Sequence, residues 1–114
     1  MHASIRFLTA AVVAFAALPA AAGCLRPAEP TLVDGNVATQ GEMVAMVKAI
    51  KKYQAELAEF RTCLDAEQQN ADGEISEEIR IISLQRYNAS VDAEASLITQ
   101  FNAAIRAYKD RNPQ

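Results

Sequence analysis

The fold is decided by residues 39–64, TQGEMVAMVKAIKKYQAELAEFRTCL. Thr39 and Glu42 have the spacing of a capping box, in which each side chain accepts a hydrogen bond from the backbone amide of the other residue at a helix start. Large apolar residues then recur at alternating intervals of three and four: Met43, Met46, Ile50, Tyr53, Leu57, Phe60 and Leu64. This heptad spacing predicts one long helix over about residues 40–71, with a single apolar seam.

A second long helix is predicted over about residues 75–111. Glu77 and Glu78 suit its positive N-terminal end, and Pro113 prevents its continuation. Its expected seam consists of Leu84, Tyr87, Val91, Ile98, Phe101, Ile105 and Tyr108. Glu94 takes the remaining seam position, and we expect its carboxylate to point outward. Two such seams predict an all-α fold, a coiled-coil-like antiparallel two-helix hairpin over residues 40–111.

Residues 1–23, MHASIRFLTAAVVAFAALPAAAG, have the layout of a secretory signal peptide. Arg6 precedes an apolar run, Pro19 ends that run, and small residues come before the expected cleavage point. The run is too short to span a bilayer, so a membrane anchor is the weaker interpretation. We therefore expect a periplasmic or secreted protein of bacterial type.

Residues 24–39 are expected to form an extended strap, because Pro27 and Pro30 favour extended backbone. Cys24 and Cys63 are the only cysteines in the chain, and two cysteines in an oxidising compartment most simply form a disulfide. An extended strap covers about 46 Å, which exceeds the roughly 35 Å of helix between Thr39 and Cys63. The sequence therefore predicts a strap that runs back along the hairpin and is tied to it by one disulfide.

Acylation of Cys24 is the alternative. The small residues 21–23 precede this cysteine as in a lipoprotein signal, although Ala21 stands where a larger aliphatic residue is usual. Acylation would make the protein a lipoprotein at a membrane surface and would leave Cys63 as a lone thiol. One sulfur atom cannot take part in both bonds, so the two interpretations exclude each other.

The second helix contains an internal repeat. The segments 87–93 and 101–107 align aromatic on aromatic and Asn88 on Asn102, two heptads apart. One interpretation is a repeated packing layer. The other is that Asn88 and Asn102 hydrogen-bond the backbone of the strap.

The connection between the helices resembles a degenerate calcium-binding EF-hand loop over residues 68–79. Asn70 and Asp72 stand at ligand positions, but Gln68 and Ile79 replace the first aspartate and the closing glutamate that such a loop needs. A plain Asp-Gly turn is the simpler interpretation of the segment. Weak calcium binding through Asn70 and Asp72 is therefore an alternative, and no other metal site is predicted.

The composition argues against several classes of function. The net charge is −3, and the only adjacent basic pair is Lys51-Lys52, so nucleic acid and anionic membranes are poor partners. The single histidine, His2, lies in the expected signal peptide. The sequence contains no phosphate-binding loop and no Ser/His/Asp set. We therefore expect no enzymatic activity and no cofactor.

Four segments, CLRPAEP, YQAELAEFRTCLD, RYNASVD and FNAAIRAYK, resemble a family of small exported helical-hairpin proteins of proteobacteria. The resemblance implies a disulfide-tied helical hairpin and brings no activity with it, so no catalytic residue is carried over. We expect a non-enzymatic structural or protein-interaction module of the bacterial cell envelope. It would associate with itself or with an envelope protein through apolar helical faces, and the residues expected there are Val44, Val47, Ile81 and Leu97.

Overall fold

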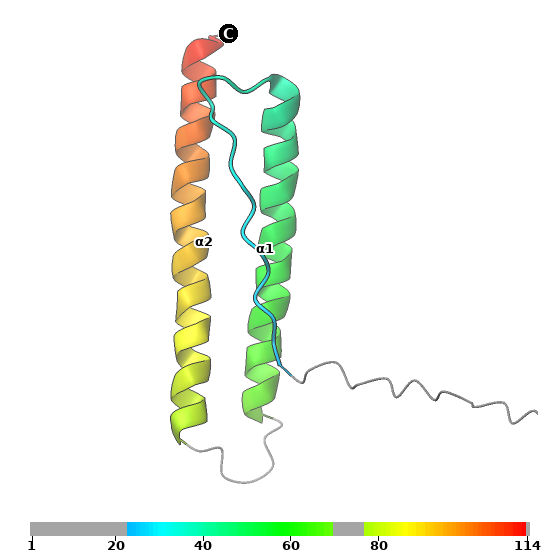
Figure 1. Cartoon of the computed structure of the whole chain (residues 1–114), viewed down its shortest axis with the longest axis vertical. Coiled ribbons are helices and arrows are strands. Elements are labelled where there is room, and N and C mark those ends of the chain that lie inside the picture. Colours follow the sequence, from blue (N-terminus) through cyan, green and yellow to red (C-terminus); the bar gives the residue numbers. More distant parts are fainter. Residues whose placement is uncertain (1–22, 70–76, 114) are drawn as a thin grey trace, which may run out of the picture.

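The computed structural model describes residues 23–69 and 77–113. They form two long antiparallel helices, α1 (Gln40–Gln69) and α2 (Glu77–Arg111), with the strap, residues 24–39, running along the pair (Figure 1). The predicted all-α hairpin is therefore confirmed. The predicted helix limits at residues 71 and 75 lie outside the described residues.

The start of α1 has the predicted capping box. The Thr39 amide donates to Glu42 Oε2 at 3.0 Å, and the Glu42 amide donates to Thr39 Oγ1 at 3.1 Å. These two bonds satisfy backbone donors that the first turn of a helix leaves without partners. The cap fixes where the strap ends and α1 begins.

The predicted seam of α1 is confirmed at every position. Its buried residues are Met43, Met46, Ile50, Tyr53, Leu57, Phe60 and Leu64. Seven apolar side chains on one helical face give α1 a continuous surface against which α2 and the strap pack.

The predicted seam of α2 is right at five of its seven apolar positions. Five residues are half-buried and pack against the core, as expected: Tyr87, Ile98, Phe101, Ile105 and Tyr108. The fully buried residues of α2, however, are Ser83, Ser90 and Leu97. Leu84 is 56% exposed and Val91 is 41% exposed. In the first half of α2, the residue that faces α1 therefore lies one position earlier than predicted: Ser83 and Ser90 are buried, whereas Leu84 and Val91 face outward.

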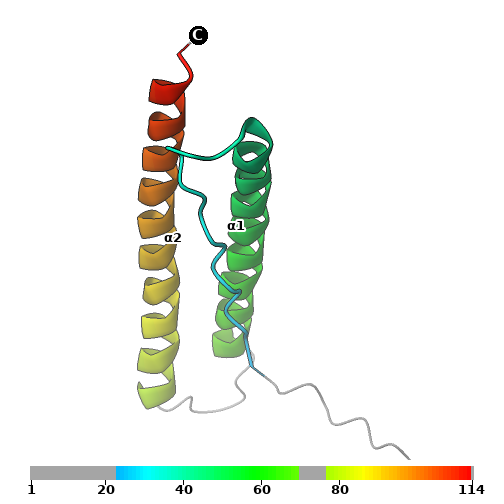
Figure 2. The ribbon, with the colours of Figure 1, turned by 45° about the horizontal axis from the view of Figure 1, so that its top comes forward.

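The strap lies over the groove between the helices on one side of the hairpin (Figures 1 and 2). Leu32 and Val33 pack against the core there. Gly35 touches the backbone of α2 so closely that an added Cβ would lie 1.9 Å from the carbonyl oxygen of Ala104. Only glycine allows this approach.

The strap turns toward α1 at Asp34. The Asn36 amide and the Asn36 side chain both donate to Asp34 Oδ1, at 2.9 and 3.0 Å, and the Ala38 amide donates to the Asp34 carbonyl at 2.9 Å. The bond from the Asn36 amide, followed by that from its side chain, holds the pKa of Asp34 below its usual value. The carboxylate's contribution to the turn is therefore present at neutral pH and is lost as the pH falls through this lowered pKa.

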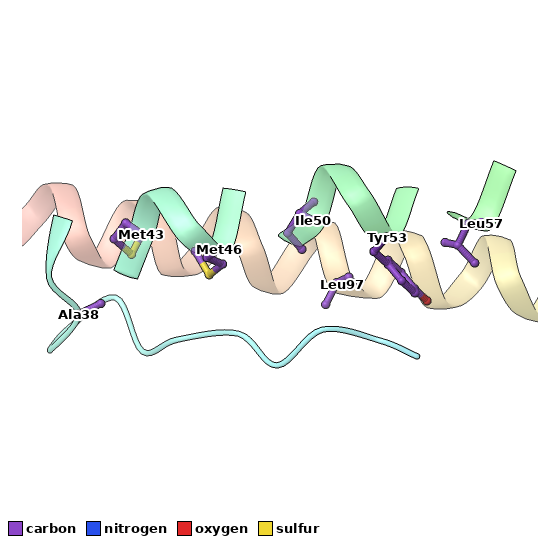
Figure 3. Close-up of a cluster of buried hydrophobic side chains, with 7 residues drawn as sticks. All are labelled: Ala38, Met43, Met46, Ile50, Tyr53, Leu57 and Leu97. Atoms are coloured by element: carbon purple, nitrogen blue, oxygen red, sulfur yellow. The ribbon is translucent and has the colours of Figure 1, made fainter. Parts of the chain in front are cut away.

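The apolar core divides into two clusters. The larger cluster lies at the open end, where α1 begins and α2 ends; its buried residues are Ala38, Met43, Met46, Ile50, Tyr53, Leu57 and Leu97 (Figure 3). The smaller cluster lies at the loop end, where α1 ends and α2 begins, and contains Cys24, Phe60 and Leu64 with Tyr87 beside them. Among the described residues, no helix is both long and apolar enough to cross a membrane.

Candidate functional site

Cys24 is held at three points at the loop end. Its sulfur forms the predicted disulfide with Cys63, and the two Cα atoms are 5.7 Å apart. Its amide donates to Glu67 Oε1 at 3.1 Å, and its carbonyl oxygen accepts a hydrogen bond from the Arg86 guanidinium. A sulfur joined to Cys63 is not free for acylation, so the disulfide form excludes a lipid anchor at Cys24.

Arg111 holds the other end of the strap. Its guanidinium donates to the carbonyl oxygens of Ala38 and, at 3.4 Å, of Gly35. Two arginines of α2, Arg86 and Arg111, therefore bind the two ends of the strap. Arg111 continues the series Ser83, Ser90, Leu97 and Ala104 in steps of seven, but this series contains too few large apolar residues to identify it from the sequence.

Asn88 and Asn102 do not make the strap contact that was one of the two interpretations of the internal repeat. Asn88 and Asn102 are both exposed, and within residues 23–69 and 77–113 neither donates to the strap. Asn88 follows Arg86 by two positions, which is about 200° around a helix. Since Arg86 faces the strap, Asn88 faces away from it, and Asn102 lies two heptads further on the same side.

A polar layer fills the space between the helices near the loop end. Arg61 Nε donates to Ser90 Oγ at 2.9 Å, and Arg61 Nη2 lies 3.1 Å from Glu94 Oε2. The predicted outward orientation of Glu94 is therefore wrong, because its carboxylate pairs with α1. Gln68 Nε2 donates to Ser83 Oγ at 2.9 Å. These bonds explain why serines, not Leu84 and Val91, face α1 here.

Metal binding has little support within the described residues. The potential ligand atoms of Cys24, Cys63 and Glu67 all lie within 4.8 Å of one another. Thiolates, and not disulfide sulfurs, are the metal ligands that cysteine provides, so this group is a structural tie while the bond is intact. Asn70 and Asp72, the calcium candidates, lie outside the described residues.

The outward face of α2 carries a second heptad seam, which we call the outer seam. It consists of Ile81, Leu84, Asn88, Val91, Ala95, Ile98, Asn102 and Ile105. Ile81 and Leu84 are 47% and 56% exposed, whereas Ile98 and Ile105 are half-buried against the core. An aliphatic seam with this much exposure is a surface suited to binding another helix.

The outer seam lies on the side of the hairpin that the strap leaves uncovered. Val44 and Val47 of α1 and Ile105 and Tyr108 of α2 line an open groove at the open end, and no strap residue contributes to it. The strap segment 25–27 instead lies beside Glu56, Glu59 and Cys63 on the other flank of α1.

Of the four residues expected on an interaction surface, three lie at the surface and one lies in the core. Val44 and Ile81 are exposed and Val47 is half-buried, but Leu97 is only 2% exposed and belongs to the core. Leu97 stands seven residues after Ser90, in the fully buried series, and directly precedes Ile98, which was the residue predicted for the seam.

No protein-family model, curated protein or solved structure matches the chain. The resemblance to small exported hairpin proteins of proteobacteria stays a prediction.

Proposed function

We propose that this chain is a non-enzymatic, exported interaction module of the bacterial cell envelope that binds a helical partner through its outer seam. The observation that carries the proposal is the exposure of aliphatic residues at heptad spacing, with Leu84 56% and Val91 41% exposed. The layout of residues 1–23 and the Cys24–Cys63 disulfide support export, because disulfides persist in oxidising compartments.

A helix is the partner that this surface fits best. The buried seam and the outer seam of α2 lie on adjacent faces of the helix. Together they form an apolar surface that is wider than the contact area of a single neighbouring helix. Such a wide apolar surface is typical of a helix that packs against two neighbours in a bundle. The strap closes one flank of the hairpin, which leaves the opposite flank for the second neighbour.

The test uses the size of the complex that the protein forms in a periplasmic extract. We expect wild-type protein to elute well above its monomer mass. Val91→Lys places a charge in the outer seam and should move the protein to the monomer position. Ala89→Lys, an exposed change two residues away and outside the outer seam, should leave the complex intact.

Circular dichroism of both variants provides the control for folding. Equal helicity and equal melting temperature would show that only the surface has changed. If the wild-type protein and both variants all elute as monomers from the extract, the proposed function is wrong.

A further inference from the structure

We infer that the helix bound at the outer seam is α2 of a second copy of this chain, lying antiparallel to the first. The inference rests on the proposed function and specifies the partner. It is carried by the order of residues in the outer seam, by their lack of charge and by the groove at the open end.

The outer seam matches its own reverse. When two copies are aligned antiparallel with Ile81 level with Ile105 of the second copy, the following layers result: Leu84 with Asn102, Asn88 with Ile98, and Val91 with Ala95. Every layer contains at least one aliphatic side chain, and the small Ala95 lies next to the two-fold axis. Antiparallel helices pack in such alternating layers of seam residues.

The asparagines give this pairing a defined register. Asn88 of one copy and Asn102 of the other fall in neighbouring layers on the same side of the interface. A polar residue in an otherwise apolar seam selects the alignment in which its amide finds a partner. The internal repeat, which places Asn88 and Asn102 two heptads apart, would therefore set the register of the two copies.

Charge also favours a second copy. None of the eight outer-seam residues is charged, although 22% of the chain is charged and its net charge is −3. The uncharged seam runs for about 36 Å along α2 at 1.5 Å per residue. Two identical acidic proteins can therefore meet along this face without burying a charged side chain in the seam itself.

The two ends of the outer seam offer each other apolar contacts. The open groove is lined by Val44, Val47, Ile105 and Tyr108, whereas Ile81 is 47% exposed at the opposite end of α2. Antiparallel pairing brings Ile81 of each copy beside Ile105 and the groove of the other. The same contact then forms twice, which closes the assembly as a two-fold dimer and does not propagate a filament.

Sedimentation equilibrium of the purified protein, with its disulfide intact, tests the partner directly. We expect a reversible monomer–dimer equilibrium. Val91→Lys should weaken association at least about tenfold, and Ala89→Lys should change it less than about twofold. If the purified protein is monomeric while extracts still contain a Val91-dependent complex, the partner is another protein. That result overturns this inference and leaves the proposed function standing.

Cross-linking tests the antiparallel order. Leu84→Cys and Asn102→Cys are prepared separately and treated with a short bis-maleimide, which does not open the native disulfide. Mixing the two variants should give cross-linked dimers. Either variant alone should not, because the like residues of two antiparallel copies would be about 27 Å apart. Efficient cross-linking of each variant alone, with none gained by mixing, would indicate a parallel dimer and overturn the inference.

Discussion

The two ends of this hairpin are held together by different physical means. The open end has a cluster of seven buried residues, with Leu32, Val33 and further half-buried side chains around it. The loop end has three buried residues, one of which is Cys24 of the disulfide. Hydrophobic burial stabilises the open end, whereas a covalent bond and polar contacts from Arg61, Gln68 and Arg86 join the segments at the loop end.

The difference follows from where α2 places its aliphatic residues. At the open end Leu97 faces inward, and Ile98 and Ile105 reach the core from its edge. At the loop end Ser83 and Ser90 face inward, and Leu84 and Val91 face outward. The loop end therefore has little core of its own and exposes the aliphatic side chains that a partner could cover.

The largest expected effect is the loss of the disulfide. In the chain-entropy model, opening a loop with a sequence separation of 39 costs roughly 4 kcal/mol of unfolding free energy. The double variant Cys24→Ser/Cys63→Ser should therefore unfold at a much lower urea concentration than the oxidised protein. A loss below about 1 kcal/mol would show that the strap is held well enough by Arg86 and Arg111 alone.

The second prediction compares two leucines. Leu57 is completely buried, so Leu57→Ala should cost about 3 kcal/mol through lost burial and a residual cavity. Leu84→Ala should cost less than about 1 kcal/mol, because Leu84 is mostly exposed in the hairpin. Both are measured by urea unfolding in the Val91→Lys background to remove any effect of association. Equal losses of unfolding free energy in the two variants would indicate that Leu84 is buried, as the sequence pattern predicted.

The third prediction concerns the strap. Gly35→Ala should cost about 2 kcal/mol, because the new Cβ would collide with the backbone of Ala104 and push the strap outward. Gly41→Ala is the matched control: the atom nearest to its added Cβ is Thr39 Oγ1 at 3.9 Å, and alanine favours the helix. Thermal unfolding of both variants measures the difference. A neutral Gly35→Ala would mean that the strap does not pack this closely on α2.

The smallest effect is expected at Tyr53. Its hydroxyl is buried, and no hydrogen-bond partner for it is found among the described residues. Tyr53→Phe should therefore raise the unfolding free energy by about 1 kcal/mol, since it removes a buried polar group without leaving a large cavity. Tyr108→Phe, at a half-buried site, should change it little. Destabilisation by Tyr53→Phe would indicate that the hydroxyl does find a partner.

Sequence patterns predicted the buried seam of α1 at every position and that of α2 in part. In α1 the buried residues are also the large apolar ones, so heptad spacing identified all of them. In α2 the largest aliphatic residues were assigned to the core, but the space beside Arg61 and Gln68 suits serine. Hydrophobicity alone could not show that polar side chains on α1 would select Ser83 and Ser90.

The disulfide was predictable because Cys24 and Cys63 are the only cysteines and the strap is long enough to join them. The contacts of Arg86 and Arg111 with the strap were not predictable, because they depend on which face of α2 meets the strap. A strap contact of Asn88 and Asn102 was one of two interpretations of their repeat, and the repeat does not specify which side they face. Which residues form the outer seam depends on the position of the buried seam, which hydrophobicity alone does not determine.

Amide hydrogen exchange, resolved by residue and measured at low and high protein concentration, tests the contrast between the two ends most directly. In dilute protein, amides of α2 at 77–91 should exchange at least about tenfold faster than those at 97–108, because the loop end opens locally first. At high concentration this difference should narrow as a second copy covers the outer seam. Equal exchange at both ends in dilute protein, or a difference that does not change with concentration, would contradict the account.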